Sequence, residues 1–186
     1  MPEPARSGPI DAVPPARAVA GAGLTLLPPA ARLIFRGREP AIAAAGTAFG
    51  IALPRTACRF AAADGRAAWW LGPDEWLLLA PEAEGTAITA ALCAALNDLA
   101  HALVDVSHRS AGLALDGAQA AYVLSHGCPL DLAPKTFPVG MCTRTLLGKA
   151  EIALARTAAE NFRIEVARSF VPYVWDFLVE ARRELA

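Results

Sequence analysis

Three polar residues near the middle of the chain, Asp105, Ser107 and His108, have the side-chain types of a hydrolytic triad. If residues 103–106 form a strand, Asp105 and Ser107 point to one side of it and His108 to the other. The members of a triad normally converge from different elements of the fold. The spacing therefore favours a strand end and a turn, in which these polar groups satisfy backbone donors.

A metal site would have to combine His126 with Cys128 and Cys142. The two cysteines are 14 residues apart across a loop that contains proline, whereas zinc ligands usually come in closer pairs. His126 lies at the end of a predicted helix, where the helix dipole favours an imidazolium. The four cysteines form no C-x-x-C pair, so we expect reduced thiols and no metal ligand.

No glycine-rich phosphate-binding motif occurs in the sequence. Gly148 and Lys149 lack a preceding glycine-rich run, and we expect them to form a hairpin turn. The residues by themselves therefore predict no catalytic residue and no cofactor-binding residue in this chain.

The elements that hold these residues are indicated by apolar periodicity. Asp116 is expected to cap the third helix, and Gly127 to end it in a left-handed conformation. We predict strands at 33–35, 69–71, 76–79, 103–106, 111–115, 141–147, 151–156 and 162–167, and helices at 40–50, 86–99, 117–126 and from 169. This order predicts an α+β fold of antiparallel or mixed sheets with helices packed on one face, arranged as two sheet-and-helix halves.

Seven of the 15 prolines lie in residues 1–30. Proline fixes φ and removes a backbone donor, so this segment is predicted to be an extended arm, which could lie along a partner, or a disordered tail. The α+β domain is expected to occupy residues 31–186.

The composition excludes several classes of function. A net charge of −1 argues against a dominant attraction to nucleic acid or to an anionic membrane. No apolar run approaches the roughly 18 residues of a membrane span, and the first residues lack the apolar core of a signal peptide. We expect a cytoplasmic protein.

Arginine makes up 15 of the 17 basic residues, and this residue type suits desolvated contacts. Trp175 lies off the apolar stripe expected for the last helix. An exposed tryptophan beside Arg168 or Arg182 would be a contact anchor, because Trp and Arg are enriched in interface hot spots.

Five segments, taken together and in order, resemble the gamma subunit of heterotetrameric sarcosine oxidase. The resemblance runs from about Arg32 to the C-terminus and leaves out the proline-rich segment. Its segments are WLGPDEWLLLAP (70–81), VDVSHRSAG (104–112), GCPLDL (127–132), FPVGMCTRTLLGK (137–149) and FRIEVARSFVPYVWDFL (162–178).

This resemblance implies a non-catalytic subunit of an enzyme that demethylates sarcosine oxidatively to glycine and hydrogen peroxide. The one-carbon unit passes to tetrahydrofolate. The implied partners are the alpha, beta and delta subunits. FAD, FMN, NAD, zinc and tetrahydrofolate are implied for the whole complex, and none for this chain alone.

The family also resembles the folate-binding domain of the glycine-cleavage T-protein. An alternative is therefore a stand-alone folate-binding or aminomethyltransferase-like protein, which needs an acid over the reactive folate nitrogen. Asp105 has no match to the T-protein's catalytic position, so no catalytic role is carried over. The family segments place Arg144, Arg168 and Trp175 among the candidate subunit contacts.

Overall fold

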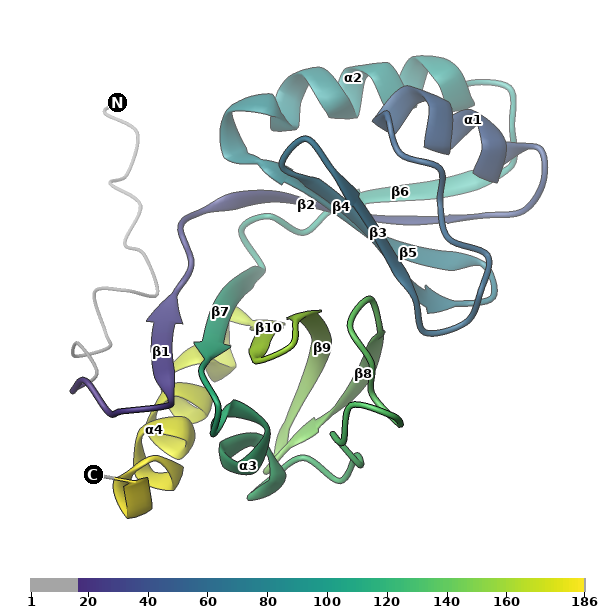
Figure 1. Cartoon of the computed structure of the whole chain (residues 1–186). Coiled ribbons are helices and arrows are strands. Elements are labelled where there is room, and N and C mark those ends of the chain that lie inside the picture. Colours follow the sequence, from purple (N-terminus) through teal and green to yellow (C-terminus); the bar gives the residue numbers. More distant parts are fainter. Residues whose placement is uncertain (1–16, 186) are drawn as a thin grey trace, which may run out of the picture.

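The computed structural model describes residues 17–185, whose strands pair antiparallel in two five-stranded sheets (Figure 1). We call the sheet with strand order β3-β4-β5-β2-β6 the N-terminal sheet, and the one with order β1-β7-β10-β9-β8 the C-terminal sheet. The strands are β1 Gly23–Leu26, β2 Ala30–Gly37, β3 Phe60–Ala63, β4 Arg66–Gly72, β5 Glu75–Pro81, β6 His101–Asp105, β7 Ser110–Asp116, β8 Cys142–Leu147, β9 Ala150–Ala158 and β10 Asn161–Ala167.

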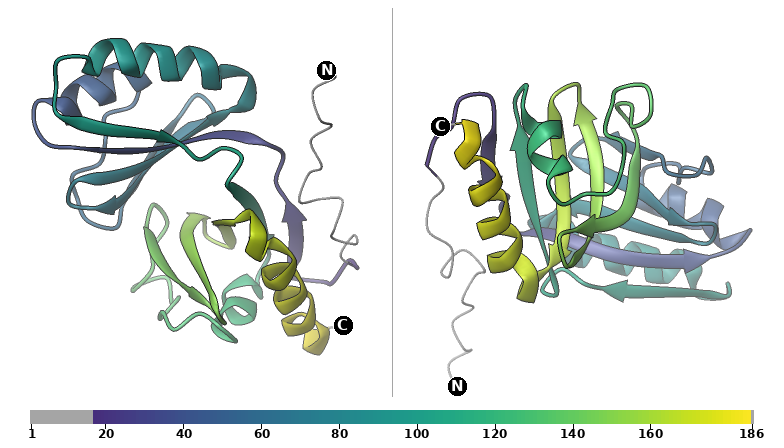
Figure 2. Two further views of the ribbon diagram at one scale, coloured as in Figure 1. Left: turned by 180° about the vertical axis from the view of Figure 1, so that it is seen from behind. Right: turned by 90° about the horizontal axis from the view of Figure 1, so that it is seen from below.

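Helices cover the outer face of each sheet (Figures 1 and 2). α1 (Ala41–Phe49) and α2 (Gly85–Leu96) lie on the N-terminal sheet, whereas α3 (Ala120–Ser125) and α4 (Val171–Ala181) lie on the C-terminal sheet. Short 3₁₀ turns complete the elements: η2 (Glu82–Glu84), η3 (Arg168–Phe170) and η4 (Arg183–Leu185). The predicted α+β class, with antiparallel sheets and helices on one face of each, is confirmed.

Alternation along the strands separates the two faces of the N-terminal sheet. In β5, Trp76, Leu78 and Ala80 belong to the core under α1 and α2, whereas Leu77 and Leu79 face the other sheet. Successive strand residues point to opposite faces, so a strand that is apolar throughout can be buried on both sides. The N-terminal sheet therefore lies between its helices and the C-terminal sheet.

The C-terminal sheet follows the same rule. Ile152 and Leu154 of β9 and Ile164 of β10 join the core beneath α3 and α4. Ala153, between Ile152 and Leu154, packs on the inner side. Glu165, which follows Ile164, forms an ion pair with Arg32 of the N-terminal sheet. The inner faces of the two sheets thus meet in the middle of the molecule.

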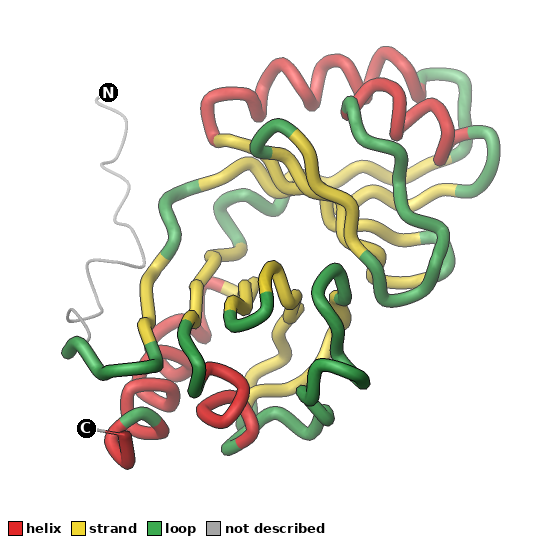
Figure 3. The backbone as a smooth tube through the Cα atoms, viewed as in Figure 1, coloured by secondary structure: helices red, strands yellow, loops and turns green. Residues whose placement is uncertain are grey.

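The chain crosses between the sheets twice, before β2 and after β6 (Figure 3). β1 pairs with β7 in the C-terminal sheet, although β2, the next strand in sequence, lies in the other sheet. The buried residues Ala22 and Leu24 belong to the C-terminal core. Within the predicted arm, Gly23–Leu26 are thus an extended strand of the C-terminal sheet, while residues 1–16 lie outside the described range.

The third helix is shorter than predicted. Gly117, with φ of 109°, breaks the chain direction, so Asp116 does not cap the helix and Gln119 precedes its first residue. Gly127 does not have a positive φ. Its lack of a side chain matters for packing instead, since a Cβ there would lie 2.5 Å from the Phe177 ring.

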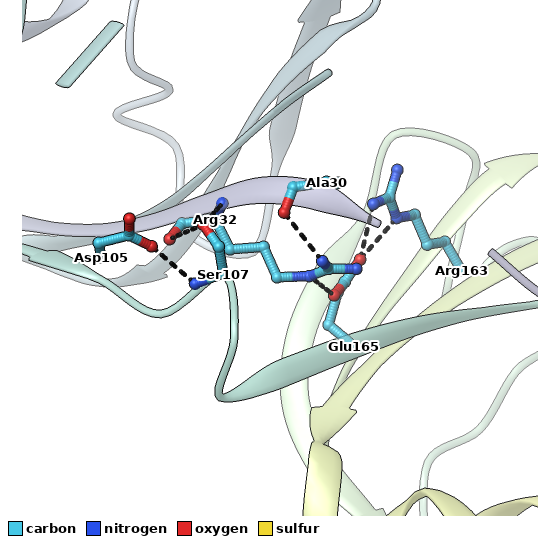
Figure 4. A network of polar contacts seen from close by, with 6 residues as sticks. All are labelled: Ala30, Arg32, Asp105, Ser107, Arg163 and Glu165. Carbon is cyan, nitrogen blue, oxygen red and sulfur yellow. Dashed lines mark hydrogen bonds and ion pairs between the residues drawn. The ribbon is translucent and has the colours of Figure 1, made fainter. Parts of the chain in front are cut away.

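A buried ion pair joins the inner faces (Figure 4). The Arg32 Nε of β2 donates to the Glu165 Oε2 of β10 at 2.6 Å, and the two residues are only 2% and 5% exposed. Arg163 donates to the other carboxylate oxygen through Nε, at 2.8 Å. Gly112 leaves room for this pair, since a Cβ there would lie 2.9 Å from Glu165 Oε1.

Both the side chain and the backbone of Arg32 form further hydrogen bonds. Its side chain also donates to the Ala30 carbonyl at 3.1 Å, and its backbone N–H donates to the Ser107 hydroxyl at 2.9 Å (Figure 4). The Val106 N–H donates to the Arg32 carbonyl at 2.8 Å. One residue therefore ties β2 to β10 and to the second crossover.

Replacing Glu165 by glutamine should lower the free energy of unfolding by about 3–5 kcal/mol, because a buried guanidinium then loses its counter-charge. Arg163→Gln removes the more exposed partner of the same carboxylate, whose side chain is 27% exposed, and should cost clearly less. Urea denaturation of both variants measures the difference. Equal losses would show that burial of the Arg32 charge does not set the cost.

Candidate functional site

The inner faces of the sheets are in contact at one end. Trp69, Leu77 and Leu79 of the N-terminal sheet pack against Cys142 and Ala155 of the C-terminal sheet. The Cys142 thiol also donates to the Trp70 carbonyl at 3.5 Å. This contact closes one side of the space between the sheets.

Further along, the sheets separate and leave a cavity of about 280 Å³, which we call the inter-sheet cleft. Its lining combines apolar and charged side chains from both sheets and from the second crossover. The apolar ones include Ile34, Leu71, Leu77, Val106 and Phe170, and the charged ones are Arg109, Arg144, Glu151 and Glu165. The lining thus offers an apolar wall with charges of both signs.

Arg144 lies on β8 with its side chain across the cleft. It forms an ion pair with Glu75, the first residue of β5, so this interaction joins the two sheets at the cleft rim. The Arg144 side chain is 41% exposed. Since surface ion pairs contribute little to stability, the residue remains available for other contacts.

Arg168 begins η3, directly after β10, and its backbone N–H donates to the Arg109 carbonyl at 2.7 Å. Its neighbours Ala167 and Phe170 line the cleft, whereas Arg168 itself is not among the lining residues. Of the three contact candidates from the sequence, Arg144 is therefore the one that lines the cleft.

Trp175 is not with them. It is 5% exposed and belongs to the core between α4 and the C-terminal sheet. The expectation of an exposed tryptophan is wrong because Trp175 lies four residues after Val171 and three before Leu178, which places it on the buried stripe of α4.

The residues of the triad alternative form a turn, as predicted. The Ser107 N–H donates to the Asp105 carboxylate at 2.8 Å, and Ser107 Oγ accepts the Arg32 N–H. The hydrogen bond from Ser107 lowers the pKa of Asp105 from its ordinary value. The carboxylate therefore orders the turn and does not orient His108.

The metal alternative is not supported by the positions of its three residues. His126 Nδ1 lies 3.0 Å from the Tyr122 carbonyl, and Cys128 Sγ lies 3.8 Å from the Thr145 hydroxyl. Cys142 packs in the contact between the two sheets. Among residues 17–185, no three His, Cys, Asp or Glu side chains gather into a group that could hold a metal ion. All four cysteines are free thiols.

Comparison with known proteins identifies the family. Residues 36–184 match the model of the "Sarcosine oxidase, gamma subunit family". The sarcosine oxidase gamma subunit of Corynebacterium sp. (strain P-1) is 37% identical over 145 residues, which cover 77% of this chain and 70% of the relative. The corresponding subunit from Arthrobacter sp. is 36% identical with the same coverage.

This chain belongs to the sarcosine oxidase gamma subunit family. A chain in the structure of heterotetrameric sarcosine oxidase from Corynebacterium sp. U-96, in complex with pyrrole 2-carboxylate, superposes with a TM-score of 0.85 at 31% identity. The match covers 91% of this chain and 88% of that chain. Both sheets thus belong to the matched fold.

The glycine cleavage system aminomethyltransferase T from Bartonella henselae shares the fold, with a TM-score of 0.67 at 16% identity over 90% of this chain and 50% of that one. The predicted likeness to the T-protein fold is therefore confirmed. Within residues 17–185 no helix has the length and apolar character needed to span a bilayer.

Trp175→Ala should act on folding, because it empties a core site. We expect the free energy of unfolding to fall by about 3–5 kcal/mol, and Trp175→Phe to cost clearly less. Thermal and urea unfolding measure both. A fully stable alanine variant would place the side chain outside the core.

Burial raises the pKa of the Cys142 thiol to about 12. At pH 8 this thiol stays protonated, so iodoacetamide should alkylate the exposed Cys93 and leave Cys142 intact in the folded chain. Mass spectrometry of the peptides reads the result, and the urea-unfolded chain is the control in which both react. Equal labelling in the folded chain would contradict the burial.

Proposed function

We propose that this chain is the non-catalytic gamma subunit of a heterotetrameric sarcosine oxidase and that it supports assembly of the enzyme. The observation that carries the proposal is the superposition, over both sheets, on a chain of the Corynebacterium sp. U-96 heterotetramer. The reaction of the complex is oxidative demethylation of sarcosine to glycine with hydrogen peroxide, and the one-carbon unit passes to tetrahydrofolate.

The partners in this proposal are the alpha, beta and delta subunits, and the complex is cytoplasmic. FAD, FMN, NAD, zinc and tetrahydrofolate belong to the whole complex and are held by the other chains. The contacts within this chain support that division. Glu165 is bound by Arg32 and Arg163, and Asp105 by the Ser107 N–H, so these acids serve the fold.

The rival proposal is a stand-alone folate-binding or aminomethyltransferase-like protein. The chain shares the T-protein fold, but a fold alone does not establish an activity. That activity would need an acid over the folate nitrogen. The acid considered for this role, Asp105, is exposed at the end of β6 and orders the following turn. The subunit proposal is therefore preferred.

Purification of the tagged chain from its native cells tests the proposal. We expect a yellow eluate with three further polypeptides that produces hydrogen peroxide when sarcosine is added. A colourless eluate with the chain alone would reject the subunit proposal and would call for a folate-binding assay.

Charge reversal at Arg144 and Arg168 together should weaken assembly, because Arg144 lies at the cleft rim and Arg168 directly follows the cleft residue Ala167. Reversal at position 144 sets a carboxylate against Glu75, and because the Arg144 side chain is partly exposed, this should cost about 1 kcal/mol in folding stability. Size-exclusion chromatography of the co-expressed subunits measures assembly, and urea denaturation measures stability.

A matched control reverses Arg55 and Arg183, which form exposed ion pairs with Glu39 and Glu180 away from the cleft. This control changes the net charge by the same amount and should assemble normally. Equal assembly of the two double variants would remove Arg144 and Arg168 from the interface.

A further inference from the structure

An apolar row crosses the inner face of the N-terminal sheet. Strand pairing sets Trp69 opposite Leu77, Leu77 opposite Ile34, and Ile34 opposite Val104. Residues directly opposite in neighbouring strands share a face. Exposure rises along the row, from 1% at Trp69 and 5% at Leu77 to 52% at Val104. The C-terminal sheet therefore covers one end of the row and leaves the other end open.

Apolar side chains from the C-terminal half border the same opening. Phe170, 44% exposed, lines the cleft, and Leu146, 48% exposed, is paired with the cleft residue Glu151. Among the described residues, six large apolar side chains are exposed, and Val104, Leu146 and Phe170 account for half of them. Apolar groups gathered at one opening are characteristic of a contact surface.

The charges at the opening are only partly matched within the chain. Arg144 pairs with Glu75, and Glu165 pairs with Arg32. In the described range, Arg109 and Glu151 line the cleft and neither forms an ion pair. The exposed Arg109 guanidinium, beside an apolar wall, is suited to bind a carboxylate of a partner protein. Glu151 would repel a second partner carboxylate placed near it.

The setting of the cleft favours a protein side chain. It holds about 280 Å³ beside the place where the apolar inner faces of the two sheets touch. Its apolar wall continues the contact that the two sheets already make with each other. An occupant that extends this contact is a polypeptide with an apolar anchor.

We propose that the open end of the inter-sheet cleft receives an apolar side chain of another subunit, between Val104 and Phe170, with a neighbouring carboxylate of that subunit on Arg109. The inference rests on the proposed function, because it takes the occupant from the same complex. It assigns the subunit contact to this cleft and not to the outer helices.

The test introduces a charge at the opening. Val104→Glu and Phe170→Glu are made in the full chain and co-expressed with the other subunits. Val139→Glu is the matched control, since Val139 is equally exposed, at 54%, but neither lines the cleft, as Phe170 does, nor pairs with a cleft residue, as Val104 does with Ile34. Dilution of the purified complexes, followed by native mass spectrometry, gives a dissociation constant for each.

Each cleft variant should raise the dissociation constant at least about 30-fold, as expected for a central contact residue, while the control stays within about threefold. Arg109→Ala should weaken binding less and reduce its dependence on salt, and Arg109→Lys should restore part of both. Unfolding midpoints equal to that of the unaltered chain show that the effects lie in binding.

Two negative results are distinguishable. If the unaltered chain recovers no other subunit, the proposed function fails. If it assembles and the cleft variants behave like Val139→Glu, the function stands and the cleft assignment is wrong. Sedimentation of the isolated chain covers a third outcome: a dimer that the cleft variants abolish would make a second copy the occupant and overturn the proposal.

Discussion

Arg32 and Glu165 lie 133 residues apart in sequence, yet their side chains meet in the interior at 2.6 Å. Their charges are removed from water, so the loss of either partner would leave an uncompensated charge in the interior. Arg163 binds the second oxygen of the carboxylate, and Gly112 leaves the space. The relative placement of the sheets, and therefore the cleft beside the pair, depends on this contact.

The cleft follows from the strand pattern together with this constraint. Apolar residues on the inner faces are covered where the sheets touch, at Trp69 and Cys142, and become exposed where they part, at Val104 and Phe170. The outer faces carry helices and the larger cores. The inner side is consequently where charged and apolar groups lie together at the surface.

The glycine cleavage system aminomethyltransferase T shares this fold, and a shared fold does not by itself specify a role. In this chain the polar residues nearest to a triad or an acid catalyst are used to order a turn, as Asp105 and Ser107 show. The match to the gamma subunit family covers residues 36–184, which include strands of both sheets.

The sequence by itself determined the class of fold, the hairpins of β4–β5 and β8–β9–β10, the helices α1, α2 and α4, and the family, because local periodicity and contiguous motifs carry that information. Tertiary structure decided that β1 joins the C-terminal sheet, that Arg32 is buried, and that Trp175 faces the core. It also set Arg144 of β8 against Glu75 of β5 at the rim of the cleft. These outcomes depend on contacts between distant segments, whose energies are absent from any local window of sequence.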